Sequence, residues 1–227
     1  MIPIIPDLPT CHVISHTALV PYQTALAWQY ALAEHRQRGE IADTLLLLEH
    51  PSVITLGRGS READLLTKEA DLEARGIAVE RVDRGGEISY HGPGQLVGYP
   101  ILDLRKHGQD LHHYLRDLEE VIIRTLSVYG LEGGRVPGRT GVWVQDRKIA
   151  ALGIKVSRWI SLHGWALNIT TDLTPFRRDI VPCGISDRDV TSMAELLPGR
   201  TPGRAEVEEA LLAAFAEIFE VSLEFSM

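Results

Sequence analysis

The stretch RGGEISYHGPGQ at residues 84–95 places four glycines, a proline, an arginine and a histidine in one short segment. Glycine costs backbone entropy in regular structure, so this density indicates positive φ angles or a close approach to another group. Gly-Pro-Gly at 92–94 predicts a turn, and Ile-Ser-Tyr at 88–90 predicts a short strand. We therefore expect a strand between two tight loops, with Arg84 at one end and His91 at the other. Such loops let backbone N–H groups reach a ligand; the alternative is a glycine-rich hairpin with a surface histidine.

Outward from this segment, helix and strand patterns follow one another irregularly. Apolar residues at helical spacing predict helices over 22–38, 68–75, 111–129 and 206–219. Alternating or continuous apolar runs predict strands at 11–15, 44–49, 53–56, 78–82, 96–102, 141–144, 148–156, 166–169 and 220–225. This mixture predicts an α+β fold, with a mixed or antiparallel sheet flanked by helices, and a single domain over 1–227.

Size and composition are those of an ordinary globular protein, with 227 residues, 44% of them hydrophobic and 24% charged. The longest unbroken aliphatic run, at 45–48, is far shorter than a membrane span. The opening residues, MIPIIPDLPT, lack the features of a signal or transit peptide. We therefore expect a cytoplasmic protein that does not enter a membrane.

Charge is distributed unevenly along the chain. The net charge of −8 argues against general nucleic-acid binding. Residues 205–227 carry six glutamates and no lysine or arginine, whereas residues 135–158 carry six basic residues against one aspartate, a balance of +5. The second segment predicts a local basic surface that suits an acidic partner or an anionic ligand. The alternative is the solvated face of a hairpin.

The two cysteines, Cys11 and Cys183, form no CxxC pair, and no metal site is expected from the sequence. Cys183 lies between a proline and a glycine, which predicts a rigid turn that could present a nucleophile. A thiolate needs a positive charge nearby, and Lys148 at the start of an apolar strand is a candidate, with Lys155 as a competitor. The alternatives are a buried structural cysteine and a solvated lysine at a strand end.

Two histidines each precede a glycine. His91 and His163 could act as bases or serve as hydrogen-bonded corners, and the residues alone do not decide between these roles. Asn168 and Asp172 are interpreted as turn and capping residues. Neither a phosphate-binding P-loop nor a dinucleotide fingerprint occurs, so local spacing does not indicate use of ATP or NAD.

Five segments taken together resemble the lipoyl(octanoyl) transferase family. They are RGGEISYHGPGQLVGYP (84–100), GRTGVWV (138–144), KIAALGIKVSRW (148–159), HGWALNITTDLTPF (163–176) and PCGI (182–185). The resemblance runs in order through most of the chain and implies the fold of the biotin and lipoate protein ligase catalytic domains. It implies transfer of an octanoyl group from octanoyl-acyl carrier protein to the acceptor lysine of a lipoyl domain, the first step of protein lipoylation.

The resemblance also implies roles for individual residues. Cys183 of the PCG motif would form the acyl-thioester intermediate, and Lys148 rather than Lys155 would be its catalytic partner. His163 is a candidate supporting residue, and the sequence leaves open whether it or His91 takes part in the reaction. The substrate-binding positions that the resemblance implies are Arg84, Gly85, Gly86, Glu87, Ile88, Ser89, Tyr90, His91, Ala151, Leu152, Gly153, Gly164, Trp165 and Ala166.

The resemblance implies neither a cofactor nor a metal. The expected donor is octanoyl-acyl carrier protein, and the expected acceptors are the lipoyl domains of 2-oxoacid dehydrogenase complexes and the glycine cleavage H protein. Nucleic acid and membrane are not expected as partners.

Three other functions fit parts of the same pattern. An ATP-dependent lipoate or biotin ligase of this fold needs no cysteine nucleophile, so Cys183 argues against it. A carrier-binding module without turnover would need neither Cys183 nor Lys148. An amidotransferase that moves octanoyl groups between lipoyl-bearing proteins shares the cysteine and differs in its donor.

Overall fold

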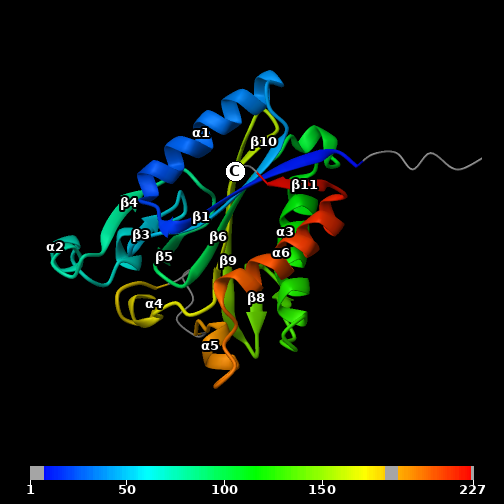
Figure 1. Cartoon of the computed structure of the whole chain (residues 1–227). Helices are drawn as coiled ribbons and strands as arrows, with labels where there is room; N and C mark the ends of the chain where they lie inside the picture. The colour runs from blue at the N-terminus through cyan, green and yellow to red at the C-terminus, as the bar shows by residue number, and fades with distance from the viewer. Residues whose placement is uncertain (1–7, 182–188, 226–227) are drawn as a thin grey trace, which may run out of the picture.

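A mixed sheet of eight strands forms the centre of the computed structural model, which describes residues 8–181 and 189–225 (Figure 1). Its strands in spatial order are β11 (Ser222–Phe225), β1 (Thr10–Leu19), β2 (Asp43–Glu49), β6 (Gln95–Ile101), β10 (Ile160–Asn168), β9 (Arg147–Ser157), β8 (Arg139–Val144) and β7 (Gly134–Val136). β1 runs parallel to β11 and β2, and every neighbouring pair from β2 to β7 is antiparallel. The α+β fold with a mixed sheet is therefore confirmed.

A second, smaller sheet carries the glycine-rich segment. Its strands are β4 (Ala78–Arg81), β3 (Val53–Leu56) and β5 (Ile88–His91), with β3 parallel to β4 and antiparallel to β5. The N–H of Gly85, in the loop between β4 and β5, donates to the carbonyl of Ile154 on β9 at 2.9 Å. This bond fixes the loop at the junction of the two sheets.

Three long helices of the described chain cover the faces of the large sheet. Helix α1 (Tyr22–Arg38) lies on one face, and α3 (Leu111–Ser127) and α6 (Arg204–Phe219) pack together on the other (Figure 1). Alternate residues of a strand point to opposite faces, so the leucine run 45–48 on β2 supplies both cores. Leu45 and Leu47 join the main core under α3 and α6, whereas Leu46 and Leu48 join a smaller cluster under α1.

Local signals place the end of α1 and the start of α3 where the sequence predicts them, whereas α3 ends two residues earlier and α6 begins two residues earlier than predicted. Gly39 directly follows α1 with a left-handed φ of 75°, and its N–H donates to the carbonyl of Arg36. The Asp110 carboxylate caps α3 by accepting from the N–H groups of His112 and His113. The sequence does not predict β7 or the short helices α4 (Thr174–Arg178) and α5 (Met193–Leu196), because such short elements show no period. The remaining helices are α2 (Glu69–Glu73) and the 3₁₀ turns Glu62–Asp64 and Leu104–Lys106.

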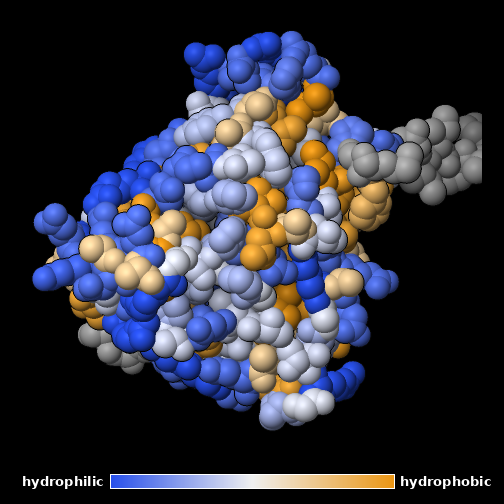
Figure 2. Space-filling view, turned by 60° about the vertical axis from the view of Figure 1, so that its left-hand side comes forward, coloured by the Kyte–Doolittle hydropathy of each residue, from blue (hydrophilic) through white to orange (hydrophobic). Residues whose placement is uncertain are grey.

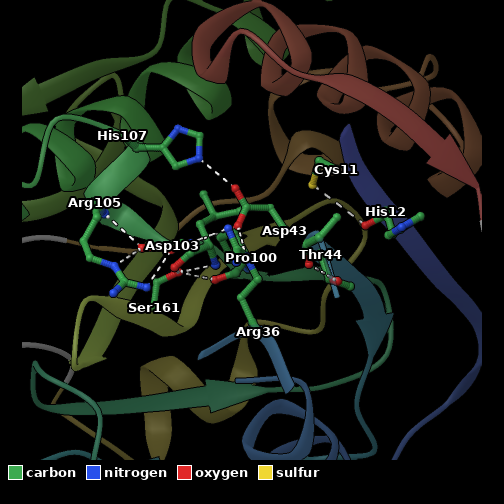
Figure 3. A network of polar contacts seen from close by, with 12 residues as sticks. Cys11, His12, Arg36, Asp43, Thr44, Pro100, Asp103, Arg105, His107 and Ser161 are labelled. Carbon is green, nitrogen blue, oxygen red and sulfur yellow. Dashed lines mark hydrogen bonds and ion pairs between the residues drawn. The ribbon is translucent and has the colours of Figure 1, made fainter. Parts of the chain in front are cut away.

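A buried network of ionic groups joins the end of α1 to the start of β2 and to the chain after β6 (Figure 3). The Arg36 Nε donates to Asp43 Oδ1 at 2.6 Å, and its Nη2 lies 3.6 Å from Asp103 Oδ2. The other Asp43 oxygen, Oδ2, lies 2.9 Å from the Nε2 of His107. Arg36, Asp43 and Asp103 are each 5% exposed or less. Arg36 thus faces two carboxylates, and Asp103 also accepts from the exposed Arg105, so each buried charge of this network has a partner of opposite sign.

Acidic side chains offset part of the positive charge of the basic segment 135–158. Three of its six cations, Arg135, Arg147 and Lys155, form ion pairs with carboxylates, and Lys148 is buried. Composition alone counts charges without the acidic side chains that folding brings beside them, so the basic surface stays a prediction. Hydrophilic residues cover most of the face shown in Figure 2, with apolar residues in small groups between them. Among the described residues, no helix combines the length and apolar character needed to cross a membrane.

Candidate active site

A cavity of about 410 Å³ is lined by residues from both sheets. Its lining is Tyr22, Arg84, Gly86, Glu87, Ile88, Ser89, His91, Val97, Tyr99, Gly138, Arg139, Thr140, Lys148, Ala151, Leu152, Gly153, His163, Gly164, Trp165, Ala166, Asn168, Phe176 and Val190. Small residues of β9 and β10 lie side by side in the register, with Ala151 opposite Ala166 and Gly153 opposite Gly164. The cavity therefore has the size of a small-molecule site and a floor without bulky side chains.

The glycine-rich segment forms one wall, as a strand between two loops. Before the strand, the loop 84–87 pairs with the backbone of 57–59, where Gly57 N–H donates to the Glu87 carbonyl at 3.2 Å and Gly59 N–H to the Gly86 carbonyl at 3.0 Å. A Cβ on Gly57 would lie 2.5 Å from the Gly86 oxygen, so only glycine permits this approach. Gly86 itself has a φ of 83°, in the left-handed region. The predicted strand between two tight loops is confirmed.

Arg84 and His91 belong to a hydrogen-bonded group at the buried side of this wall. The Arg84 Nη2 donates to the carbonyl and hydroxyl of Thr55, at 3.1 and 2.7 Å. The Gln95 amide nitrogen donates to the Tyr90 carbonyl, so its oxygen accepts from the Nδ1–H of His91 at 2.8 Å. Burial holds the pKa of His91 well below its usual range. His91 is therefore a neutral imidazole held as a hydrogen-bonded corner.

Asn168 has a different place from the one predicted for it. It lies buried at the end of β10, accepts from Gln95 Nε2 at 2.9 Å and donates to the carbonyl of Thr191 at 3.0 Å. The turn interpretation of Asn168 is wrong because its amide fills a hydrogen-bonding position inside the protein rather than at a chain reversal. Asp172 does act as a cap, since its carboxylate accepts from the N–H of Thr174 at the start of α4.

His163 joins a second polar group at the edge of the cavity. Its Nε2 lies 3.3 Å from Asp83 Oδ1, and its backbone N–H donates to Gln29 Oε1 at 2.8 Å. Burial lowers the pKa of His163 to about 4. Asp83 also binds the ammonium of Lys155, whose pKa is raised by this carboxylate, and accepts from the hydroxyl of Tyr30. Lys155 is thus engaged outside the cavity lining.

Lys148, by contrast, lines the cavity and is 7% exposed. Its Nζ lies 5.4 Å from the centre of the Trp143 ring. Its backbone N–H donates to the Asp189 carbonyl at 3.0 Å, and its carbonyl accepts from the N–H of Thr191 at 2.9 Å. The chain that resumes at Asp189 is therefore bonded directly to the start of β9. Cys183 lies outside the described residues.

Most of the sequence-predicted binding positions come together in this cavity. Gly85 and Tyr90 are not among the lining residues. Gly85 instead joins the two sheets through its bond to Ile154. The Tyr90 hydroxyl lies 3.1 Å from Ser52 Oγ, and its ring packs edge-on against Phe176. Trp165 contributes to the lining, while its indole packs in the main core near Phe215, with ring centres 6.3 Å apart. Tyr90 is outside the lining because its ring packs into the core of the small sheet, in one cluster with Ile88 and Phe176, which also reach the cavity.

The sequence analysis did not predict several of the residues that line the cavity. Tyr22 and Tyr99 line the cavity from α1 and β6, and Phe176 lines it from α4. Arg139 and Thr140 also line it, and the GRTGVWV motif contains both. That motif could have indicated them, whereas nothing local marks Tyr22, which reaches the cavity only because α1 packs across the sheet.

Replacing Gly153 with alanine is expected to lower the free energy of unfolding by about 1–3 kcal/mol, as overpacking does in well-packed sites. An added Cβ would lie 2.7 Å from the Gly85 oxygen and 3.2 Å from Arg84 Cδ, where the two sheets meet. Urea-induced unfolding measures the change. Gly134→Ala is the matched control, because its Cβ would meet nothing within 4 Å. Identical unfolding curves for the two variants would contradict the close approach at Gly153.

The sequence profile of the lipoyl protein ligase A/B catalytic domain matches residues 21–216 of the chain. The chain belongs to this family. Among relatives in the lipoyl protein ligase A/B family, it is 53% identical over 206 residues to an octanoyltransferase of Nostoc sp. strain PCC 7120, covering 90% of each chain. It is 51% identical over 209 residues to an octanoyltransferase of Chloroflexus aurantiacus, covering 91% of this chain and 93% of the relative. Relatives at this level of identity make the chain an acyltransferase.

Solved structures of the lipoyl protein ligase A/B family and of biotin protein ligases share the fold. A bi-partite lipoate protein ligase from Thermoplasma acidophilum matches with a TM-score of 0.74 and 18% identity, over 97% of this chain and 87% of that one. A biotin protein ligase from Aquifex aeolicus in complex with biotin and ATP matches with a TM-score of 0.56 and 18% identity, over 92% and 70%. At this identity the likeness concerns the fold alone. The fold predicted from the sequence motifs is thereby confirmed.

Proposed function

We propose that this protein transfers an octanoyl group from octanoyl-acyl carrier protein to the acceptor lysine of lipoyl domains, through a thioester on Cys183. The observation that carries the proposal is the identity of about half of all residues with octanoyltransferases over nine-tenths of the chain. The acceptors would be the lipoyl domains of 2-oxoacid dehydrogenase complexes and the glycine cleavage H protein. In this proposal the whole chain, 1–227, acts in the cytoplasm as one catalytic domain without a cofactor.

The cavity has the properties that an octanoyl chain requires. Its floor is made of Ala151, Gly153, Gly164 and Ala166, which leave room for a flexible apolar chain. Val97, Leu152 and Phe176 add apolar side chains to the lining. Burial of methylene groups against such surfaces supplies the binding free energy. We therefore place the acyl chain along β9 and β10, with the loop 84–87 as the opposite wall.

The proposed chemistry proceeds in two steps. First, the Cys183 thiolate attacks the thioester carbonyl of the donor: a new carbon–sulfur bond forms, the bond between the acyl carbon and the carrier sulfur breaks, and the carrier leaves as a thiol with a proton from the Lys148 ammonium group, which becomes a neutral amine. Then the acceptor lysine amine attacks the acyl-enzyme, an amide bond forms, and the Cys183 thiolate is released. Because one thioester replaces another, the first step stores the acyl group at little cost in free energy.

Lys148 is the proposed partner of Cys183 in both steps. As an ammonium group it stabilises the thiolate, and as a neutral amine it accepts the proton that the attacking lysine loses. Two observations favour Lys148 over Lys155. Lys148 lines the cavity and is bonded through its backbone to Asp189 and Thr191, whereas Lys155 binds the Asp83 carboxylate.

The decisive experiment is an intact-mass measurement after brief incubation with octanoyl-acyl carrier protein. We expect an octanoyl adduct that hydroxylamine removes and that Cys183→Ser does not form. Cys11→Ser is the matched control and should acylate normally, because Cys11 is fully buried and burial raises the pKa of its thiol to about 12. An active protein without an adduct, or one that releases AMP from ATP and free octanoate, would refute the proposal in favour of an ATP-dependent ligase.

A further inference from the structure

A buried carboxylate on α3 contacts the β7–β8 hairpin from outside the cavity. The Glu119 side chain is 1% exposed, and its Oε1 accepts from the backbone N–H of Gly141 at 3.0 Å. Its Oε2 accepts from Arg135 Nε at 3.0 Å and from Arg116 Nη1 at 2.5 Å. Glu119 does not line the cavity, so the proposed reaction makes no direct use of it.

Gly141 is the point where this contact reaches Lys148. A Cβ on Gly141 would lie 2.5 Å from Lys148 Cε and 3.3 Å from Lys148 Nζ. The lysine side chain therefore passes directly over the Gly141 backbone, in the space that the missing side chain leaves. Gly141 also has a φ of 132°, in the region that favours glycine. The position of the Gly141 backbone thus sets the position of the Lys148 ammonium.

We propose that Glu119 is a positioning residue for Lys148, acting through its hydrogen bond to the Gly141 N–H. This inference rests on the proposed function, in which Lys148 is a catalytic residue. Without the bond, the buried N–H of Gly141 loses its acceptor and the start of β8 shifts, so the ammonium leaves its place above Gly141. A misplacement of about 1 Å at a reacting group can lower a rate by about a hundredfold.

The chain offers variants that separate positioning from stability. Arg116 and Arg135 are 53% and 33% exposed at their side chains, so water can solvate them when Glu119 is removed. Glu119→Ala removes the hydrogen bond and both ion pairs, whereas Glu119→Gln keeps an acceptor oxygen for Gly141 and loses the bonds to both arginines, because the amide NH2 in place of Oε2 cannot accept from them. Glu120→Ala is the matched control, because Glu120 binds the same Arg135 at 2.8 Å and no bond joins it to Gly141.

The experiment combines transfer kinetics with trace acetylation of the full-length protein by acetic anhydride. Peptide mass spectrometry gives the labelling of Lys148 relative to Lys68, an exposed lysine on another part of the surface. For Glu119→Ala we expect kcat to fall about ten- to hundredfold with KM unchanged, and Lys148 labelling to rise several-fold. Glu119→Gln and Glu120→Ala should stay close to wild type in both measurements.

The labelling decides the inference even if the protein has another activity, because it reports on Lys148 directly. Unchanged Lys148 labelling in Glu119→Ala would overturn the positioning role. So would a loss of kcat in Glu120→Ala equal to that in Glu119→Ala, since the effect would then follow the ion pairs with Arg135. Gly141→Ala provides a second route, because its Cβ intrudes on the lysine and should raise the labelling in the same way.

Discussion

Replacing Lys148 with alanine is expected to lower kcat/KM for octanoyl transfer by about 10²–10⁴-fold, the range typical of a positioned acid–base group. The variant loses both the charge that stabilises the thiolate and the base that accepts the proton from the acceptor lysine. Steady-state transfer to a lipoyl domain measures the overall effect. Single-turnover acylation and deacylation then show which of the two steps is slowed.

Lys155→Ala is the matched control for this prediction. Lys155 lies seven residues further along β9 and binds Asp83 at the edge of the cavity. Because Lys155 lies outside the cavity lining, its removal should leave the rates of both chemical steps close to those of the wild type. A larger loss of kcat in Lys155→Ala than in Lys148→Ala would show that the catalytic lysine has been assigned wrongly.

The second large effect is expected in the buried network at the end of α1. Asp43→Ala should lower the free energy of unfolding by about 3–5 kcal/mol, because it takes from a buried guanidinium its closest carboxylate and leaves only Asp103, at 3.6 Å. Arg36 is 5% exposed, and its Nε lies 2.6 Å from Asp43 Oδ1. Urea-induced unfolding followed by circular dichroism measures the change.

The exposed pair between Arg38 and Glu34 on α1 provides the control for the buried network. Both side chains are more than half exposed, so Arg38→Ala should change stability little. A double variant, Arg36→Met with Asp43→Leu, should recover much of the stability that Asp43→Ala loses, because no buried charge then lacks a partner. Equal destabilisation by Asp43→Ala and the double variant would contradict this explanation.

The same network gives the stability a defined dependence on pH. Burial alone would raise the pKa of the Asp43 carboxyl, but hydrogen bonds from His107 and Arg36 outweigh it and hold the pKa below its usual range. A depressed pKa means that Asp43 stabilises the folded state above the pKa of the unfolded chain. This stabilisation is lost as the pH falls through the folded-state pKa. In Asp43→Ala the acid-induced loss of stability should therefore be smaller than in wild type.

Local sequence signals predict much of the fold. The residues of α1 and β3 are those expected, because Gly39 ends the helix in a left-handed conformation and Pro51 precedes the strand. The glycines of 84–95 mark the loops at the cavity, because only glycine tolerates the approach of Gly57 to the Gly86 oxygen. Such signals are local, since they depend on the conformations that each residue can adopt.

The prediction of the binding residues succeeds where motif and geometry agree and fails where a side chain turns away. Arg84 and His91 line the cavity as expected, whereas Tyr90, between residues that also line it, points toward Phe176. Alternation along β5 predicts that consecutive side chains point to opposite faces of the small sheet. It does not predict which of these faces lines the cavity. That choice depends on how the small sheet packs against the large one.

The sequence by itself determined the α+β class, the positions of the long helices, the glycine loops and the family to which the chain belongs. Only the tertiary structure decided which lysine of β9 lines the cavity, because this depends on the irregular β8–β9 register beside Lys148 and on the packing that brings Asp83 to Lys155. It also decided that Glu119 contacts Gly141 and that Lys155 is neutralised by Asp83. These contacts join residues far apart in the chain, and such proximity arises from packing rather than from any local pattern.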